Sequence, residues 1–134
     1  MKVHKLPSNA HEFSKIWKNL LKTTADRYNF LLTVGSQRLG QIFHGEISFG
    51  LLGEMISVLS SNYSADDGTQ LVAMLQALST ANRFNLSLQF LDDSERRACS
   101  QLLQQLHETF VSDVDEASQQ AVDAVNSLMT VYSV

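Results

Sequence analysis

The stretch RFNLSLQF, residues 83–90, decides the fold class of this 134-residue chain, because its apolar side chains occupy every second position. Strict alternation is the pattern of a half-buried β-strand. A lone strand would leave its backbone N–H and C=O groups unpaired, and no second segment of the sequence has a strand pattern that could pair with it. We therefore predict a short helix over residues 83–90.

A helix in this stretch has apolar side chains around its whole circumference, so one side is left over when the other is buried. Phe84 and Leu88 are expected to turn toward the core. Arg83, Leu86 and Phe90 are spaced i, i+3 and i+7 and share the opposite face. An arginine and an aromatic ring beside a small apolar patch have the composition of a binding hot spot. The alternative, in which Leu86 and Phe90 are core residues, fits the sequence equally well.

Helical periodicity continues through the rest of the chain, with apolar residues three and four positions apart. In the fourth helix, Gly50 and Gly53 are expected to let another backbone approach closely. The predicted apolar faces, helix by helix, are Phe13, Ile16, Trp17, Leu20 and Leu21; Tyr28, Leu31 and Leu32; Leu39, Ile42 and Phe43; Phe49, Leu52, Met55, Ile56 and Leu59; Leu71, Met74, Leu75 and Leu78; Ala98, Cys99, Leu102, Leu103, Leu106 and Phe110; and Ala121, Val122, Val125, Leu128, Met129 and Tyr132.

Short polar residues before these faces predict the helix starts, because their side chains can accept hydrogen bonds from the first free N–H groups. Gly35 and Gly45 predict the ends of the second and third helices, since glycine readily adopts the left-handed conformation that follows a helix. The predicted caps are Asn9, with Glu12 three residues on; Thr24 or Asp26; Ser36; Ser48; Ser64; Asp92 or Asp93; and Asp113 or Asp115.

The composition agrees with this helical pattern. With one proline and six glycines, the chain has too few turn residues for a many-stranded domain, and its 44% apolar content is that of a globular protein. We predict an all-α fold, a single compact bundle or superhelix of seven to eight short helices. A lead-in covers residues 1–8, a helical interaction domain residues 9–110, and an extra helix residues 111–134. That last helix is expected to dock on the bundle, with pairing to a second copy or to another protein as alternatives.

Charge is unevenly placed along the chain. Residues 1–22 carry five lysines and one glutamate, whereas residues 98–134 carry five carboxylates and no lysine or arginine. Solvation of helix faces is the expected role, and the alternatives are steering of a partner and attraction between the two ends. A net charge of −4 argues against a nucleic-acid partner. Without a long apolar stretch or a signal peptide, we expect no membrane partner and a cytoplasmic location.

The sequence offers no pattern typical of catalysis. The four histidines are scattered, with none three or four residues from another histidine or from Cys99. Cys99 lies on an apolar face, where a small buried hydrophobe is expected. The acidic pairs at residues 66–67 and 92–93 precede predicted helices, where carboxylates stabilise the helix start. We therefore expect no enzyme activity, no metal and no cofactor.

Several of these segments, taken in order, resemble the C-terminal domain family typified by RNA polymerase II-associated protein 3. The resemblance covers roughly residues 7–107 and includes Phe13 and Trp17, Arg27 and Tyr28, and the 83–91 stretch. Within the family, the segments QRLGQIFHGEISFGLLGEM, STANRFNLSL and SERRACSQLLQQL resemble those members that are dynein axonemal assembly factors.

The resemblance implies an all-helical interaction domain that docks onto RuvB-like AAA+ ATPases, which act with a heat-shock chaperone, and that works with other dynein assembly factors. It implies a role in cytoplasmic preassembly of axonemal dynein arms and in cilium motility, with a ciliary location besides the cytoplasmic one. By position, the docking side chains are Arg83, Leu86 and Phe90, with Leu86 replacing a family methionine of similar size. The alternative is a self-associating scaffold that uses the last helix.

Overall fold

The computed structural model describes residues 6–112 and 115–134, and in this part of the chain it contains seven α-helices, one 3-10 helix and no strand. The predicted all-α fold is confirmed, and the helix predicted over residues 83–90 is present over residues 84–89. The elements are α1 (Ala10–Asn19), α2 (Thr24–Ile42), α3 (Leu51–Ser61), η1 (Ala65–Asp67), α4 (Gly68–Ser79), α5 (Phe84–Gln89), α6 (Asp93–Val111) and α7 (Glu116–Val131).

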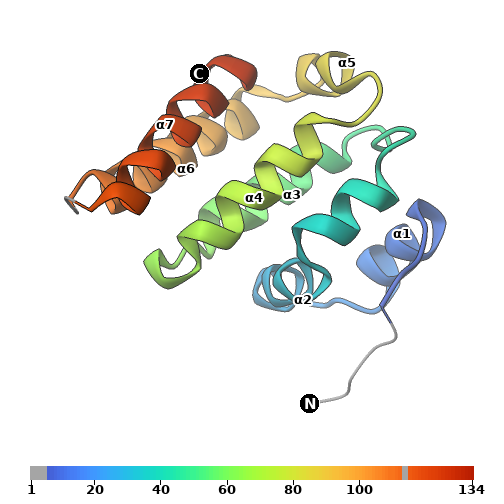
Figure 1. The fold of residues 1–134 in the computed structure, drawn as a ribbon. Helices are drawn as coiled ribbons and strands as arrows, with labels where there is room; N and C mark the ends of the chain where they lie inside the picture. The colour runs from blue at the N-terminus through green and yellow to red at the C-terminus, as the bar shows by residue number, and fades with distance from the viewer. Residues whose placement is uncertain (1–5, 113–114) are drawn as a thin grey trace.

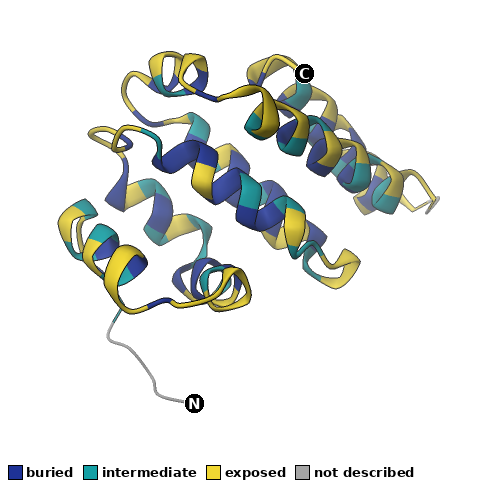
Figure 2. Ribbon diagram, turned by 180° about the vertical axis from the view of Figure 1, so that it is seen from behind, coloured by how far each residue is buried: buried dark blue, intermediate teal, exposed yellow. Residues whose placement is uncertain are grey.

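The helix α4 lies at the centre of the structure and packs against α2 on one side and α7 on the other. Behind it, α3 packs along α6, and α6 in turn packs along α7 (Figure 1). The helices turn their buried sides toward one shared interior, as the dark stripes in Figure 2 show. α1 covers one end of this arrangement, and α5 forms a corner between α4 and α6. No helix among residues 6–112 and 115–134 is long and apolar enough to span a bilayer.

An aromatic cluster fixes α1 to the bundle. The Phe13 ring stacks on Trp17 at 5.5 Å between centroids and meets the edges or tilted faces of Phe43 and Phe30 at 5.0 and 5.4 Å. Phe13 and Trp17 are fully buried. Burying such large rings is strongly favourable, because their area leaves water and their edge contacts add to it. The predicted core role of this helix face is confirmed for these two residues.

Polar and charged side chains also contact Trp17. Its indole Nε1 donates to Glu54 Oε1 at 3.3 Å, and the Arg27 guanidinium lies over the ring, 4.7 Å from its centroid. Arg27 Nη1 is also 3.6 Å from Glu54 Oε1, so α1, α2 and α3 meet in one contact. Because both charged side chains are partly exposed, their ion pair stabilises the fold little compared with the buried rings.

Three predicted caps are confirmed. Asn9 Oδ1 accepts from Glu12 N at 2.9 Å, Asp92 Oδ1 from Glu95 N at 2.8 Å, and Asp115 Oδ1 from Ser118 N at 2.7 Å. At Asp92 the bond is reciprocal, because Glu95 Oε1 accepts from the Asp92 N–H at 3.0 Å. Asp113, the other residue predicted for the last cap, lies outside the described residues.

Other predicted starts were wrong. α2 is capped by Thr23, not by Thr24 or Asp26, and its hydroxyl accepts from Asp26 N at 3.0 Å. α3 begins after Gly50, whose backbone is left-handed with a φ of 79°, and not after Ser48. The side chain of Ser64 makes no capping bond, and a turn of 3-10 helix, η1, lies between Ser64 and α4.

The predicted second and third helices are the two segments of α2, which are separated by a sharp break at Gly35. α2 continues to Ile42, and its backbone breaks at Gly35, where φ is 81° and ψ is 162°. A positive φ is uncommon without glycine, so Gly35 interrupts the helix as predicted. A second helical segment therefore begins after Gly35, as predicted, and it ends at Ile42, before the predicted end at Gly45.

Two residues predicted to be apolar-face residues are exposed instead. Leu20 is the residue that follows α1, and half of its surface is in water. Phe49 lies before α3 and is 81% exposed. Helical spacing predicts the direction of a side chain only where the backbone is helical, and both residues lie just outside their helices.

Gly53 allows a close approach, as predicted, but the group that approaches it is the Glu95 carboxylate rather than another backbone.

The last helix packs within the chain's own core. Val125 and Leu128 of α7 are buried with α4 and α6, and the Tyr132 hydroxyl donates to the Leu75 carbonyl of α4 at 2.7 Å. The apolar stripe that self-association through α7 would need is thus used inside the molecule.

We predict that Trp17→Ala lowers the free energy of unfolding by about 3–5 kcal/mol, because it leaves a large cavity under α1. Urea titration followed by circular dichroism measures this loss. Val111→Ala, which truncates an exposed residue, is the control and should leave stability nearly unchanged. A similar midpoint for Trp17→Ala and wild type would contradict the core role of Trp17.

We further predict that stability falls as the pH rises above about 9. Burial raises the pKa of the Cys99 thiol to about 11 and holds the pKa of the Tyr132 hydroxyl well above its usual value. Burial and the bond to Asp67 also raise the pKa of Tyr28. In this range the unfolded chain releases these protons while the folded chain keeps them, so alkali favours unfolding. Tyr132→Phe should show a shallower decline between pH 9 and 11 than wild type, and parallel curves would contradict this.

Candidate functional site

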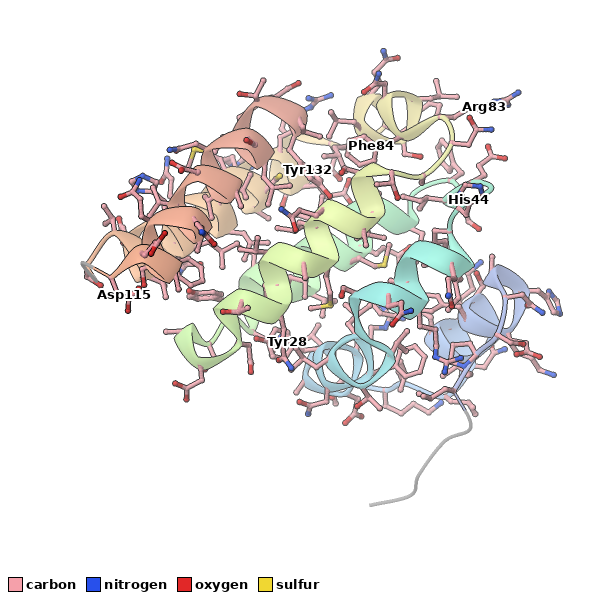
Figure 3. The ribbon with its side chains drawn as sticks, viewed as in Figure 1. Tyr28, His44, Arg83, Phe84, Asp115 and Tyr132 are labelled. Carbon is pink, nitrogen blue, oxygen red and sulfur yellow. The ribbon has the colours of Figure 1, made fainter. Side chains whose placement is uncertain are left out.

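The helix α5 places one of its sides in the core. Phe84 and Leu88 are buried, and the Phe84 ring meets the Tyr132 ring edge-on at 5.0 Å (Figure 3). Both side chains turn inward, as their positions on a helix predicted. The contact with Tyr132 fixes how α5 is rotated about its own axis.

The opposite side of α5 faces solvent. Leu86 is 44% exposed and Phe90 49% exposed, so neither is a core residue. Arg83, at the start of the helix, is exposed as well and points outward in Figure 3. All three residues predicted from spacing are thus accessible at the surface. Large apolar side chains at half exposure cost free energy in water unless another surface covers them.

Arg83 has an unusual backbone for its residue type. Its φ is 60°, in the left-handed region, which costs a non-glycine residue on the order of 1 kcal/mol. The preceding Asn82 N–H donates to the His44 carbonyl at 3.1 Å, so the approach to α5 is tied to the loop after α2. Among the described residues, no carboxylate forms an ion pair with Arg83.

A second aromatic ring, which sequence reasoning missed, stands beside Phe90. Phe49 lies 4.6 Å from Phe90 between ring centroids, at an interplanar angle of 62°. It comes from the loop of residues 43–50, so two elements far apart in sequence contribute to one surface. We call Phe49, Arg83, Leu86 and Phe90 the α5 surface. The signal that could have revealed Phe49 is the Gly50 that follows it, since glycine directly before an apolar run is typical of a helix that begins later.

Arg96 of α6 holds the end of α5 in place. Its Nε donates to the Leu91 carbonyl at 3.2 Å, and its Nη2 donates to the Gln89 carbonyl at 3.3 Å. These carbonyls lie on either side of Phe90, so the backbone of the aromatic residue is fixed while its ring stays accessible. Because this backbone is already fixed, less conformational entropy is lost when a partner binds.

The requirements of a metal site and of a reactive cysteine are not met in the described part of the chain. There, no group of three or more His, Cys, Asp or Glu residues could hold a metal ion. Cys99 is buried with a raised pKa, so its thiol is protonated and unreactive at neutral pH. A pocket of about 300 Å³ beside α1 is lined in part by Glu12 and Lys15. A second pocket, of about 540 Å³, lies between α3 and α6 and is lined in part by Arg97.

Comparison with known proteins identifies the type of domain. A family model described as the potential Monad-binding region of RPAP3 matches residues 6–96. The NMR structure of the C-terminal domain of human RPAP3 has the same fold, with a TM-score of 0.72 over 93% of this chain and 92% of that one, at 13% identity.

Curated relatives carry a consistent name. Dynein axonemal assembly factor 19 of Xenopus tropicalis is 34% identical over 96% of this chain and 56% of its own length. The protein of that name from Mus musculus is 36% identical over 75% of this chain and 42% of its own length. A homologue from Chlamydomonas reinhardtii is 27% identical over 72% of this chain and 42% of its own length. The chain therefore spans about half the length of the curated relatives it matches.

The two sides of α5 should respond differently to truncation. We predict that Phe84→Ala lowers the free energy of unfolding by about 3–5 kcal/mol, whereas Leu86→Ala and Phe90→Ala change it by less than about 1 kcal/mol. Thermal unfolding of the three variants measures the contrast. Equal losses for Phe84→Ala and Phe90→Ala would show that α5 is rotated differently.

Proposed function

The chain belongs to the family of the RPAP3 C-terminal region, and from this membership we propose that it is a non-catalytic protein-interaction domain of a dynein axonemal assembly factor. The name shared by its curated relatives supports the biological role.

The proposed partner is a RuvB-like AAA+ ATPase, which the family resemblance suggests, and the proposed contact is the α5 surface. The observation that carries this proposal is the half exposure of Leu86 and Phe90 on a helix whose other side is firmly buried. Rigid, partly exposed aromatic and aliphatic side chains near an arginine are the usual anchors of protein interfaces. Arg83 would set the orientation of the partner through its charge.

In this proposal the domain acts as an adaptor. It would bring the ATPase and its chaperone to immature dynein arms in the cytoplasm, before the arms attach in the cilium and drive its motility. Such a role needs recognition and release rather than a chemical step, so binding through a small anchor patch on a stable scaffold suffices.

The test is Phe90→Ala. We predict about 2 kcal/mol weaker binding of a purified RuvB-like ATPase, or roughly a thirtyfold higher Kd, because a central aromatic anchor is lost. Isothermal titration calorimetry measures the affinity, and circular dichroism checks that the variant is folded.

Val111→Ala is the matched control. Val111 is 55% exposed at the end of α6, which Figure 1 shows at the opposite side of the molecule from α5. It should bind like wild type. A folded Phe90→Ala variant with unchanged affinity would refute the assignment of this surface.

A further inference from the structure

We infer that Phe49 is a contact residue for the partner, and that the partner segment presents an apolar side chain and, about two helical turns away, a carboxylate. This inference rests on the proposed function and adds two things to it: a second structural element in the interface and the chemistry of what binds there.

The exposure of Phe49 is imposed by the backbone around it. Ile47 on one side and Leu51 on the other are buried at 2% and 3% exposure, so the loop is fastened to the core at both ends. Between them the chain turns at Gly50, with a φ of 79°, and Leu51 N donates to the Ser48 carbonyl at 3.0 Å. This turn leaves the Phe49 side chain in water, where it contributes little to folding.

Phe49 and Phe90 form a preformed aromatic pair. The two rings meet edge to face, 4.6 Å apart, yet 81% of Phe49 and 49% of Phe90 stay accessible. The loop is tied to the start of α5 by the bond from Asn82 N to the His44 carbonyl, and the end of α5 is held by Arg96. Both rings are therefore positioned before any partner arrives, which favours their use as anchors for an apolar side chain.

Arg83 supplies the second part of the recognition. Its guanidinium is exposed and lacks a carboxylate partner among the described residues, so a partner carboxylate can pair with it. Arg83 directly precedes α5 and Phe90 directly follows it, so the two residues lie at opposite ends of a six-residue helix that is about 9 Å long. A matching segment would place its acidic and apolar side chains about two helical turns apart on a helix, or about three residues apart on a strand.

The experiment compares single variants in titrations with the purified RuvB-like ATPase. Phe49→Ala should raise the Kd at least tenfold and leave the unfolding temperature unchanged, since the side chain is mostly in water. Arg83→Glu should weaken binding more than Arg83→Gln, because it repels the partner carboxylate. Val111→Ala again serves as the control.

A direct readout of contact comes from Phe49→Trp. Its exposed indole should shift to shorter emission wavelength when the ATPase binds, whereas Trp17 is fully buried in the free protein and gives a constant background. No shift on binding would overturn the role of Phe49.

The possible outcomes separate the two proposals. If Phe90→Ala weakens binding while Phe49→Ala does not, the inference fails and the proposed function stands. If Arg83→Glu and Arg83→Gln bind equally, the acidic character of the partner segment is refuted. If wild type does not bind, or if neither aromatic variant changes the affinity, the proposed function fails and the inference with it.

Discussion

The edge-to-face contact between Phe84 and Tyr132 is the constraint on which the candidate site depends. A helix of six residues with apolar side chains all around can bury one side of itself, and this contact decides which side that is. Once Phe84 and Leu88 are inside, Leu86 and Phe90 have to be outside. The exposed apolar surface is therefore a geometric consequence of core packing. No additional helix or loop is needed to present it.

Much of this could be predicted from sequence, because it depends on periodicity and local capping. The all-α class followed from the lack of a second strand pattern, and the inward and outward sides of α5 followed from helical spacing. Asn9, Asp92 and Asp115 were predictable because a side chain that accepts from the N–H three residues on is a local bond. These features need no knowledge of what lies across the fold.

The features that were missed depend on helix boundaries or on contacts between distant segments. A helix start displaced by two residues at Gly50 moved Phe49 from the predicted core to the surface. The pairing of Phe49 with Phe90 joins residues 41 positions apart, and the Glu95 carboxylate beside Gly53 joins α6 to α3. Sequence spacing carries no information about such pairs, so the second element of the α5 surface was visible only in the structure.

The position of Tyr132 also shows that the α5 surface depends on residues near the end of the chain. The family model ends at residue 96, yet Phe84 of α5 packs against the ring of Tyr132. The Tyr132 hydroxyl in turn donates a hydrogen bond to the Leu75 carbonyl in the central helix, α4. The fold shared with the RPAP3 domain covers 93% of this chain, so the likeness in structure reaches beyond the residues that the family model matches. A fragment that stops near residue 96 would lack most of α6 and all of α7, and with them Tyr132, against which the inner side of α5 packs. The last helix thus supports the α5 surface without taking part in it.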